Sequence, residues 1–487
     1  MRICVEANHK YVDEIQSVAQ VFFPHARFGN TNAENDLPDC TIVSNIENDM
    51  VRTILKSNPL AAAGLSPALI ADPLCLSLEL PLQIRSPYLN AKRIAMLALY
   101  HLLQNNIGAY APWGALTGVR PTKMIREWIN AGQSDEEITG QLLNTFCVHE
   151  DRVRLAMAVA HAENRLAARI ITGDRLGVYV SIPFCPSRCS YCSFNTAHKP
   201  YSIETQARYV QAIEAECQEL LRNLRETGMS ISSIYIGGGT PTALSDSLLE
   251  NLLTAVKEIV HANIEYTIEA GRPDTITRSK LRIMRKYGAN RISINPQTFN
   301  NRTLEAIGRN HTTQDFFRAF EMAREEGFNC INTDIIAGLP GEGPEDMQCT
   351  MEALAPLNPE NITIHTLAIK RASKLNEHRM DHSLSPYMLP CAQTIKAQLQ
   401  IAHEGCIAQG LFPYYLYRQK NMAALFENTG YSRPGHECLY NVGMMAELQT
   451  VLGIGAGAVS KYVDGAKITR KFNVKNPEIY IERRINS

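Results

Sequence analysis

Residues 178–192 read VYVSIPFCPSRCSYC, an apolar run followed by three closely spaced cysteines. The run 178–182 is rich in β-branched residues and ends at Pro183, so it predicts a buried strand with the cysteines on a loop at its carboxyl end. Thiolates are the usual protein ligands of iron–sulfur clusters, which normally take four. Cys185, Cys189 and Cys192 supply three, which leaves one iron free to take a substrate or a cofactor.

The same cysteines fit other kinds of site. With His198 they supply the ligands of a closed zinc site, which is a usual structural arrangement. A lone cysteine is often a small buried side chain, and a disulfide is disfavoured in a long chain without a secretory signal. The spacing favours a cluster and leaves zinc as the alternative.

Length and composition describe an ordinary globular protein. The 487 residues are too many for one core, so two or three domains are expected. A net charge of −1 indicates no basic surface for nucleic acid or for an anionic membrane. There is no apolar run of signal-peptide or membrane-spanning type. Thirteen scattered cysteines favour a reducing compartment, so we expect a cytoplasmic protein without a nucleic-acid partner or a membrane span.

Residues 1–172 are predicted to form an N-terminal α/β accessory domain. Apolar patterns predict strands at 2–6 and 75–82 and helices at 91–104, 123–129 and 151–168. The segment 111–123, APWGALTGVRPTK, is rich in glycine, proline and threonine and predicts a structured loop. Its Arg120 and Lys123 either bind an anion at the following helix start or belong to an interdomain contact, and the contact is favoured.

Residues 173–375 alternate regularly between short apolar strands and amphipathic helices. The strands are predicted at 178–182, 233–236, 265–269, 291–295, 332–336 and 361–367, and the helices at 205–224, 248–261, 278–287, 313–327 and 344–355. This alternation indicates parallel βαβ units, in an incomplete barrel or an open doubly wound sheet. In both architectures the functional groups collect at the carboxyl ends of the strands. Residues 376–487, with a helix at 384–405, are predicted to form a mainly helical C-terminal domain, and 413–422 to cover the barrel.

Polar groups recur at those strand ends. The second strand runs into a Gly-Gly-Gly-Thr turn, whose glycines let a ligand approach the backbone closely. Glu269 and Asp334 lie among apolar neighbours, where a carboxylate is costly unless it meets a donor or a cation. Gln297, Arg309 and His365 are further polar residues in or after the later predicted strands. Each has an ordinary structural explanation, but their repetition at one end of every strand favours a site.

These motifs together resemble a known family. The spacing Cys-x3-Cys-x2-Cys, with an aromatic residue before the third cysteine and a later Gly-Gly-Gly-Thr-Pro, resembles the radical S-adenosylmethionine (SAM) superfamily. The strand-end residues narrow the resemblance to oxygen-independent coproporphyrinogen III oxidases (dehydrogenases), over about residues 177–470. Segments 116–123 and 414–422 resemble the HemZ-type branch. The resemblance implies an incomplete parallel (β/α)6 barrel of radical SAM type.

The resemblance also implies roles for individual residues. Cys185, Cys189 and Cys192 would hold three irons of a 4Fe-4S cluster, whose fourth iron takes the amine and carboxylate of SAM. Arg309 would neutralise that carboxylate, which suits its planar fork of donors. The other implied SAM contacts are Tyr179, Gly238, Gly239, Thr240, Glu269, Gln297, Asp334, Ala368 and, as a backbone contact, Val459. No side chain is assigned as an acid or a base.

The implied reaction is the radical oxidative decarboxylation of two propionates of coproporphyrinogen III to vinyl groups, giving protoporphyrinogen IX in haem biosynthesis. A flavodoxin- or ferredoxin-like protein would donate the electron. The tetra-anionic substrate needs cations, and candidates at strand ends and loops are Arg188, Lys199, Arg272, Lys370, Arg371 and Lys374. The alternative for each of them is a solvated surface charge.

Four departures from the family pattern keep a second function open. Ser193 stands where a further cysteine is typical, Ser181 replaces a histidine, Asn295-Pro296 replaces Gly-Val, and the typical N-terminal segment has no counterpart. The alternatives are a haem-trafficking protein and a haem-processing radical enzyme of the same fold. A Tyr-Trp pair near the C-terminal domain marks the trafficking relatives. Both tryptophans here, Trp113 and Trp128, are N-terminal, which favours the enzyme.

Overall fold

The computed structural model describes residues 1–23, 26–29, 38–57, 75–81, 90–108, 111–118, 120–171, 173–192, 201–260, 264–369, 373, 375, 389–419, 425–465 and 467–485. Contacts within the chain divide it into two compact units. The first contains Met1–Pro121 and Trp128–Leu155, and the second contains Thr122–Glu127 and Ala156–Ser487. The three domains predicted at 1–172, 173–375 and 376–487 stay a prediction, and by contacts the last two belong to one unit.

The first unit contains a five-stranded sheet with the order β2-β1-β3-β4-β5. Its strands are β1 (Arg2–Ala7), β2 (Arg27–Phe28), β3 (Cys40–Glu47), β4 (Met50–Ser57) and β5 (Cys75–Pro81). Strand β1 is parallel to β2 and β3, whereas β3, β4 and β5 are antiparallel. The strands expected at 2–6 and 75–82 are confirmed, and β2, β3 and β4 come in addition.

Helices in this unit follow ordinary helix chemistry. Helix α1 (Val12–Phe22) buries Ile15, Val18, Ala19 and Phe22, which share one face at helical spacing. Helix α2 (Ala91–Ile107) begins where the Asn90 side chain accepts a hydrogen bond from the Arg93 amide and ends at Gly108 in the left-handed conformation. The later helical segments are α3 (Pro121–Asn130), α4 (Asp135–Gly140), η3 (Gln141–Thr145) and α5 (Glu150–Ile170), and α3 and α5 have residues in both units.

The second unit is built on an eleven-stranded sheet with the order β12-β13-β11-β10-β9-β8-β7-β6-β14-β15-β16. The six central strands are β6 (Arg175–Ile182), β7 (Ser230–Gly238), β8 (Glu265–Glu269), β9 (Arg291–Ser293), β10 (Ile331–Ala337) and β11 (Asn361–Thr366). All six are parallel, as their positions in the sequence predict. The order does not close on itself, so the fold is the incomplete barrel of radical SAM type.

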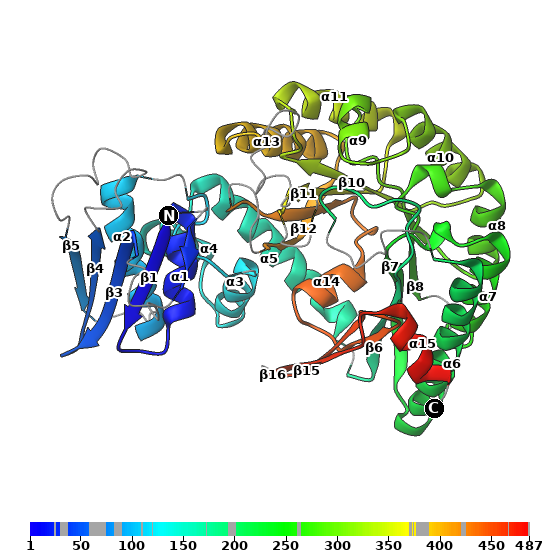
Figure 1. Ribbon diagram of the computed structural model, residues 1–487, viewed down its shortest axis with the longest axis horizontal. Coiled ribbons are helices and arrows are strands. Elements are labelled where there is room, and N and C mark those ends of the chain that lie inside the picture. The colour runs from blue at the N-terminus through cyan, green and yellow to red at the C-terminus, as the bar shows by residue number, and fades with distance from the viewer. Residues whose placement is uncertain are drawn as a thin grey trace. The chain divides into compact units, whose positions relative to one another are not determined.

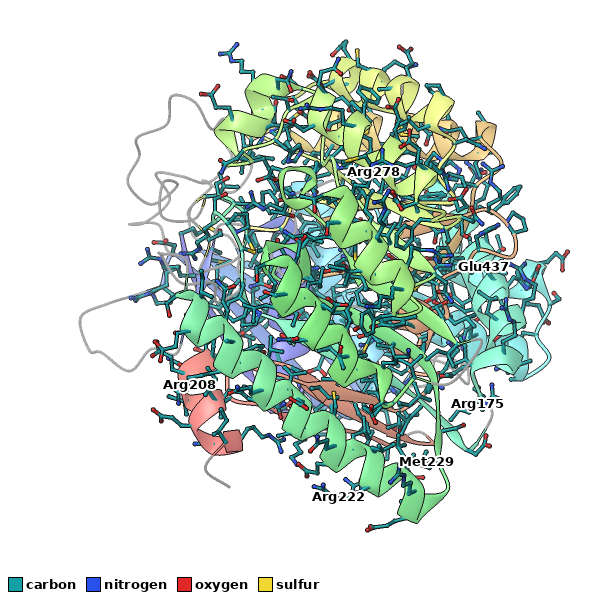
Figure 2. All side chains as sticks on the ribbon, turned by 90° about the vertical axis from the view of Figure 1, so that its right-hand side faces the viewer. Arg175, Arg208, Arg222, Met229, Arg278 and Glu437 are labelled. Carbon is teal, nitrogen blue, oxygen red and sulfur yellow. The ribbon has the colours of Figure 1, made fainter. Side chains whose placement is uncertain are left out.

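Helices cover the outer face of this curved sheet (Figure 1). They are α6 (Ile203–Thr227), α7 (Asp246–Lys257), α8 (Arg278–Lys286), α9 (Asn301–Ala306), α10 (Thr313–Glu325) and α11 (Pro344–Leu354), with short turns η4 (Pro241–Ala243), η5 (Pro273–Thr275) and η6 (Ala355–Leu357). Five of the helices start at a capping side chain that accepts a backbone hydrogen bond, namely Ser202, Ser245, Thr277, Asn300 and Thr312. Their outer faces are polar, and Arg208, Arg222 and Arg278 are exposed there (Figure 2).

The C-terminal region is less helical than expected. Its described residues form α13 (Ala392–Ala408), α14 (Leu439–Met445) and α15 (Pro477–Ile485) and also five strands, β12 (Phe412–Tyr417), β13 (Asn428–Ser432), β14 (Val451–Ile454), β15 (Val459–Asp464) and β16 (Lys467–Phe472). The β12–β13 hairpin extends the sheet antiparallel to β11, and β14 joins the other edge parallel to β6. The buried carboxylate of Glu216 on α6 accepts hydrogen bonds from the Gly455 amide and the Tyr480 hydroxyl, which ties α15 to the barrel.

The segment 122–127 is held in the second unit by buried carboxylates. The Thr122 hydroxyl lies 3.2 Å and the Arg126 guanidinium 3.4 Å from the two oxygens of Glu163, whose exposed fraction is 0%. Lys123 lies 3.2 Å from Glu447. Lys123 and Glu447 both belong to the second unit, so this ion pair lies within one unit, and the two interpretations of Arg120 and Lys123 stay predictions.

We expect Glu163→Ala to lower the free energy of unfolding by about 3–5 kcal/mol, because it leaves the charge of Arg126 buried without its acid. Urea titration followed by circular dichroism measures the loss. The control is Glu150→Ala, on the same helix, which removes an exposed ion pair with Arg154 and should cost less than about 1 kcal/mol. Equal losses in the two variants would contradict the expectation.

Candidate functional site

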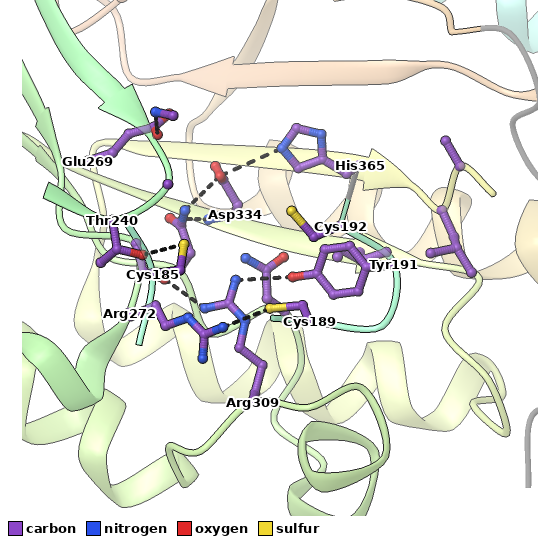
Figure 3. A pocket seen from close by; sticks show the side chains of 18 of the residues that line it. Cys185, Cys189, Tyr191, Cys192, Thr240, Glu269, Arg272, Arg309, Asp334 and His365 are labelled. Atoms are coloured by element: carbon purple, nitrogen blue, oxygen red, sulfur yellow. Dashed lines mark hydrogen bonds and ion pairs between the residues drawn. The ribbon is translucent and has the colours of Figure 1, made fainter. Parts of the chain in front are cut away.

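One cavity of about 370 Å3 opens at the carboxyl ends of the parallel strands. The residues predicted for the site all line it with one exception: Tyr179, Cys185, Cys189, Cys192, Gly238, Gly239, Thr240, Glu269, Gln297, Arg309, Asp334 and Ala368. Figure 3 shows the three cysteines facing the same space as Glu269, Asp334 and Arg309. Six strand ends thus converge on one volume, as parallel topology requires.

The exception is Val459, which the structure does not bring to this cavity. It is the first residue of β15, and in the sheet order β15 is separated from β6 by β14. The resemblance implies a backbone contact with the cofactor at this position, and that contact stays a prediction.

The cysteine loop is bound tightly to the glycine-rich end of β7. The Gly239 amide donates to the Ile182 carbonyl at 2.6 Å, and the Thr240 amide donates to the Phe184 carbonyl at 2.7 Å. A Cβ on Gly239 would lie 2.4 Å from that Phe184 oxygen, so no other residue fits without moving backbone. The glycines hence position the loop, in addition to any ligand contact.

The cysteines themselves meet donors and a cation. Arg272 donates from Nη2 to Cys189 Sγ at 3.1 Å, and Thr240 Oγ1 lies 3.4 Å from Cys185 Sγ. Burial raises the pKa of the Cys185 thiol, while the Thr240 hydrogen bond and the Arg272 charge oppose that rise. These are surroundings suited to cluster thiolates, whose potentials depend on such hydrogen bonds. The donor set therefore fits a cluster with three protein ligands.

The zinc alternative finds no support in the described residues. His198, its fourth ligand, lies outside them. Within them, no three His, Cys, Asp or Glu side chains are grouped so that they could hold a metal ion. Three cluster cysteines bind three different irons, so they do not need to gather about one point as zinc ligands do.

Glu269 and Asp334 lie in the same cavity but in opposite electrostatic conditions. Burial raises the pKa of Glu269 to about 7, although the Tyr235 hydroxyl donates to it at 2.6 Å. Burial acts in the same direction on Asp334, but hydrogen bonding to His365 and Asn332 outweighs it and holds the pKa of Asp334 below its usual value. Glu269 consequently exchanges a proton near neutral pH, whereas Asp334 is ionised.

Arg309 and Gln297 are held in unusual states. Arg309 donates to the Gly271 carbonyl at 2.8 Å and to the Tyr191 hydroxyl at 3.0 Å, and its buried Nε has no hydrogen-bond partner in the part of the chain that the structure describes. Gln297 is buried with a φ of 68°, a left-handed conformation that costs a non-glycine residue about 1–3 kcal/mol. Backbone bonds to β10 hold it there. An unpaired donor and a strained residue at one cavity are typical of a binding site.

One wall of the cavity consists of His365 on β11 and of Tyr417, Gln419 and Asn428 from the β12–β13 region. His365 was a candidate by its place on the last predicted strand, and Tyr417 and Gln419 lie in the segment 413–422 that was predicted to cover the barrel, whereas Asn428 was not predicted. His365 Nε2 lies 3.7 Å from Asp334 Oδ2. Asn428 is 1% exposed, its Oδ1 accepts from the Thr366 amide at 2.8 Å, and its buried Nδ2 has no hydrogen-bond partner among the described residues. The three tyrosines in 413–422 were the available signal, and nothing local singles out Asn428.

The predicted cations have different outcomes. Arg188 lines the cavity. Arg272 lines it too, but its guanidinium is bound to the cysteine loop rather than open to a propionate. Lys199, Lys370, Arg371 and Lys374 lie outside the described residues, as does Ser193.

The cysteine loop after the first strand of an incomplete parallel barrel defines a radical SAM protein, and the model of the Radical SAM superfamily matches residues 179–354. The chain is 38% identical over 398 residues to the oxygen-independent coproporphyrinogen-III oxidase-like protein HemZ of Bacillus subtilis, covering 79% of this chain and 77% of that one. It therefore belongs to the HemZ-type branch of the oxygen-independent coproporphyrinogen III oxidase family.

Two further similarities are informative. The chain is 31% identical over 310 residues to the heme chaperone HemW of B. subtilis, covering 62% of this chain and 74% of HemW. The solved structure of coproporphyrinogen III oxidase (HemN) from Escherichia coli matches with a TM-score of 0.50 and 24% identity, over 67% of this chain and 72% of that chain, and shows the same fold.

Radical SAM proteins bind a 4Fe-4S cluster and SAM, and these are the cofactors of this chain. None of the helices in the described part of the chain has the length and apolar character that a membrane crossing requires.

We expect Gly239→Ala to reduce the iron and sulfide content of the reconstituted chain several-fold. The added methyl group collides with the Phe184 and Ile182 carbonyls, so the cysteine loop must move away from β7. The measurement is iron and acid-labile sulfide per chain after anaerobic reconstitution. Gly140→Ala is the control, because a Cβ there meets only the end of the Asn144 side chain at 3.9 Å. A full cluster content in Gly239→Ala would refute the role of this glycine.

We also expect the cofactor-free chain to lose stability as the pH rises from about 5 to about 8. Burial raises the pKa of Glu269 and of Glu342 from 4.5 to about 7, so both bind a proton more tightly in the folded chain. The contribution of each carboxyl to the free energy of unfolding is complete below 4.5, its pKa in the unfolded chain. That contribution is lost as the pH rises through about 7, its pKa in the folded chain. Each amounts to something on the order of 3 kcal/mol.

Urea titrations at the two pH values measure this loss. Glu269→Gln should remove the part due to Glu269, because glutamine keeps the acceptor for Tyr235 and does not titrate. Glu250→Gln is the control: hydrogen bonding to Lys286 holds the pKa of this exposed carboxyl below its usual value, outside the tested range. A wild-type pH dependence in Glu269→Gln would show that this carboxyl is not the source.

Proposed function

We propose that the chain is an oxygen-independent coproporphyrinogen III dehydrogenase, which converts two propionates to vinyl groups and yields protoporphyrinogen IX for haem biosynthesis. The observation that carries the proposal is the single cavity in which the cysteine loop faces a wall of polar side chains from β11 to β13. The similarity to HemZ over most of both chains supports it.

The cofactor half of the cavity is assigned as follows. Cys185, Cys189 and Cys192 hold the cluster. Arg309 meets the SAM carboxylate, which would give its unpartnered Nε an acceptor. Contacts to the rest of SAM come from Tyr179, Gly238, Gly239, Thr240, Glu269, Gln297, Asp334 and Ala368. When bound, cluster and SAM supply the one-electron chemistry that removes a hydrogen atom from the substrate.

The substrate half has the chemistry that a propionate needs. The Asn428 Nδ2 is a buried donor without an acceptor, and leaving it unpaired is costly, so an oxygen of the substrate is its natural partner. His365 beside the ionised Asp334 adds a second group that can donate to a carboxylate. Arg188 supplies a cation at the cavity. These groups hold one propionate side chain with its carbon chain toward the cofactor.

The reaction balances with one external acceptor. Each propionate loses one hydrogen atom to the cofactor, one CO2 and one electron, and a vinyl group remains. The electron leaves to an acceptor outside the chain. A flavodoxin- or ferredoxin-like protein is proposed as the reductant of the cluster. Residues of the cavity orient the side chain and keep water from the reacting carbon.

A second candidate is haem trafficking, which the 31% identity to a heme chaperone favours. The polar side chains of the cavity support either role, because a tetrapyrrole with carboxylate arms would be the ligand in both. The two tryptophans belong to the first unit and are buried there, so no tryptophan contributes to the cavity from the described C-terminal region. A radical reaction on haem is the third possibility for the same cofactor residues.

The deciding experiment is an anaerobic assay of the reconstituted, reduced chain with SAM and coproporphyrinogen III, with porphyrins and 5′-deoxyadenosine followed by mass spectrometry. We expect a product that has lost two CO2, and no product in Cys189→Ala. Cys349→Ala, which replaces an exposed cysteine on α11, should retain the activity.

Two results would contradict the dehydrogenase. Formation of 5′-deoxyadenosine with unchanged coproporphyrinogen means that another tetrapyrrole is the substrate, and haem is the first to test. Absence of both products from a chain with a full cluster favours trafficking, which a haem-binding titration then examines directly.

A further inference from the structure

Arg272 makes a direct contact with one of the three cluster cysteines. Its Nη2 donates to Cys189 Sγ at 3.1 Å and to the Ser187 carbonyl at 2.7 Å, and its Nη1 donates to Ser187 Oγ at 2.9 Å. The side chain is 3% exposed. Figure 3 shows the guanidinium of Arg272 beside Cys189 and next to the side chain of Arg309.

The backbone fixes the position of this guanidinium. Arg272 follows β8 and begins the turn η5, in which its carbonyl accepts from the Thr275 amide at 3.0 Å and from the Thr275 hydroxyl at 2.8 Å. The same hydroxyl pairs with Thr242 beyond β7 at 2.6 Å. The two bonds to Ser187 then set the plane of the guanidinium, so the cation is in place before a cluster binds.

Arg272 donates its hydrogen bond to the sulfur of Cys189, although its charge also acts on Cys185. The hydrogen-bonding group beside Cys185 is the neutral hydroxyl of Thr240. Arg309, the neighbouring cation, donates to Gly271 and Tyr191. The charged hydrogen bond therefore falls on Cys189. A cation acts more strongly in such a buried place than at the surface, because water screens it less.

Reduction adds one electron, and therefore one negative charge, to a cluster. A cation that donates a hydrogen bond to a ligand sulfur stabilises the more negative, reduced form. Hydrogen bonds to the sulfurs are among the factors that set cluster potentials. We propose that Arg272 is a positioning residue that raises the reduction potential of the 4Fe-4S cluster through its hydrogen bond to Cys189, so that a weaker reductant suffices.

The test is a potentiometric titration of the full reconstituted chain without SAM, with dithionite as reductant and the reduced cluster followed by electron paramagnetic resonance. In Arg272→Gln, the ratio of reduced to oxidised cluster at a given potential should fall about tenfold, which is a shift of about 59 mV to lower potential. Arg272→Lys keeps the charge without the fork and should shift the potential less, in the same direction. Iron and sulfide are measured for each variant.

Two control variants separate the sulfur contact from other effects. Ser187→Ala removes the Nη1 partner and leaves the bond to Cys189, so the potential should stay close to that of the wild type. Arg278→Gln removes the same charge from the outer face, where Arg278 pairs with Glu325 and Glu326 (Figure 2). It should not change the potential.

Three results would overturn the proposal. The first is a wild-type potential in Arg272→Gln with full iron content. The second is an equal shift in Ser187→Ala, which would assign the effect to the loop. If Arg272→Gln fails to retain iron, Arg272→Lys decides: a lower potential supports the role, and an unchanged potential is the third contrary result.

Discussion

The pairing of the cysteine loop with the end of β7 is the constraint on which the rest of the site depends. Two short backbone bonds, from the Gly239 and Thr240 amides to the Ile182 and Phe184 carbonyls, place the loop directly above the sheet. They require a strand end without a side chain, and Gly239 supplies it. The register of β6 on β7 then decides which residues of the neighbouring strands face the cysteines.

The second constraint is that charged side chains buried at the cavity need partners, and the cavity provides these partners in different ways. Asp334 is stabilised by the side chains around it, whereas Glu269 keeps a raised pKa because its donors do not offset burial. Arg272 and Arg309 lie close together, yet each has acceptors of its own. Arg272 donates to the carbonyl and hydroxyl oxygens of Ser187 and to the sulfur of Cys189, whereas Arg309 donates to the Gly271 carbonyl and the Tyr191 hydroxyl. A site with such separated charges can receive a zwitterionic ligand without large rearrangement.

The sequence allowed prediction of the parallel core, because each of its strands is followed by the helix that covers it. It also identified the cavity residues at those strand ends, since parallel strands bring their carboxyl ends together. Asn428 escaped because it belongs to β13, which pairs antiparallel with β11, and its partner Thr366 is 62 positions away in the sequence. The place of Arg272 after a predicted strand suggested a role for it. The turn η5 determines where its side chain points, and no local sequence pattern reveals that turn.

The parallel pairing of β14 with β6 bears on how the protein forms in the cell. The Ser181 hydroxyl, four residues before Cys185, donates to the Ala456 carbonyl, and 275 positions of chain separate the two residues. Strand β6, which precedes the cysteine loop, thus lacks one of its two neighbouring strands until β14 has left the ribosome. Contacts this distant in sequence form late and slowly. The strand before the cluster-binding loop accordingly gains its second neighbour only after β14 has been translated.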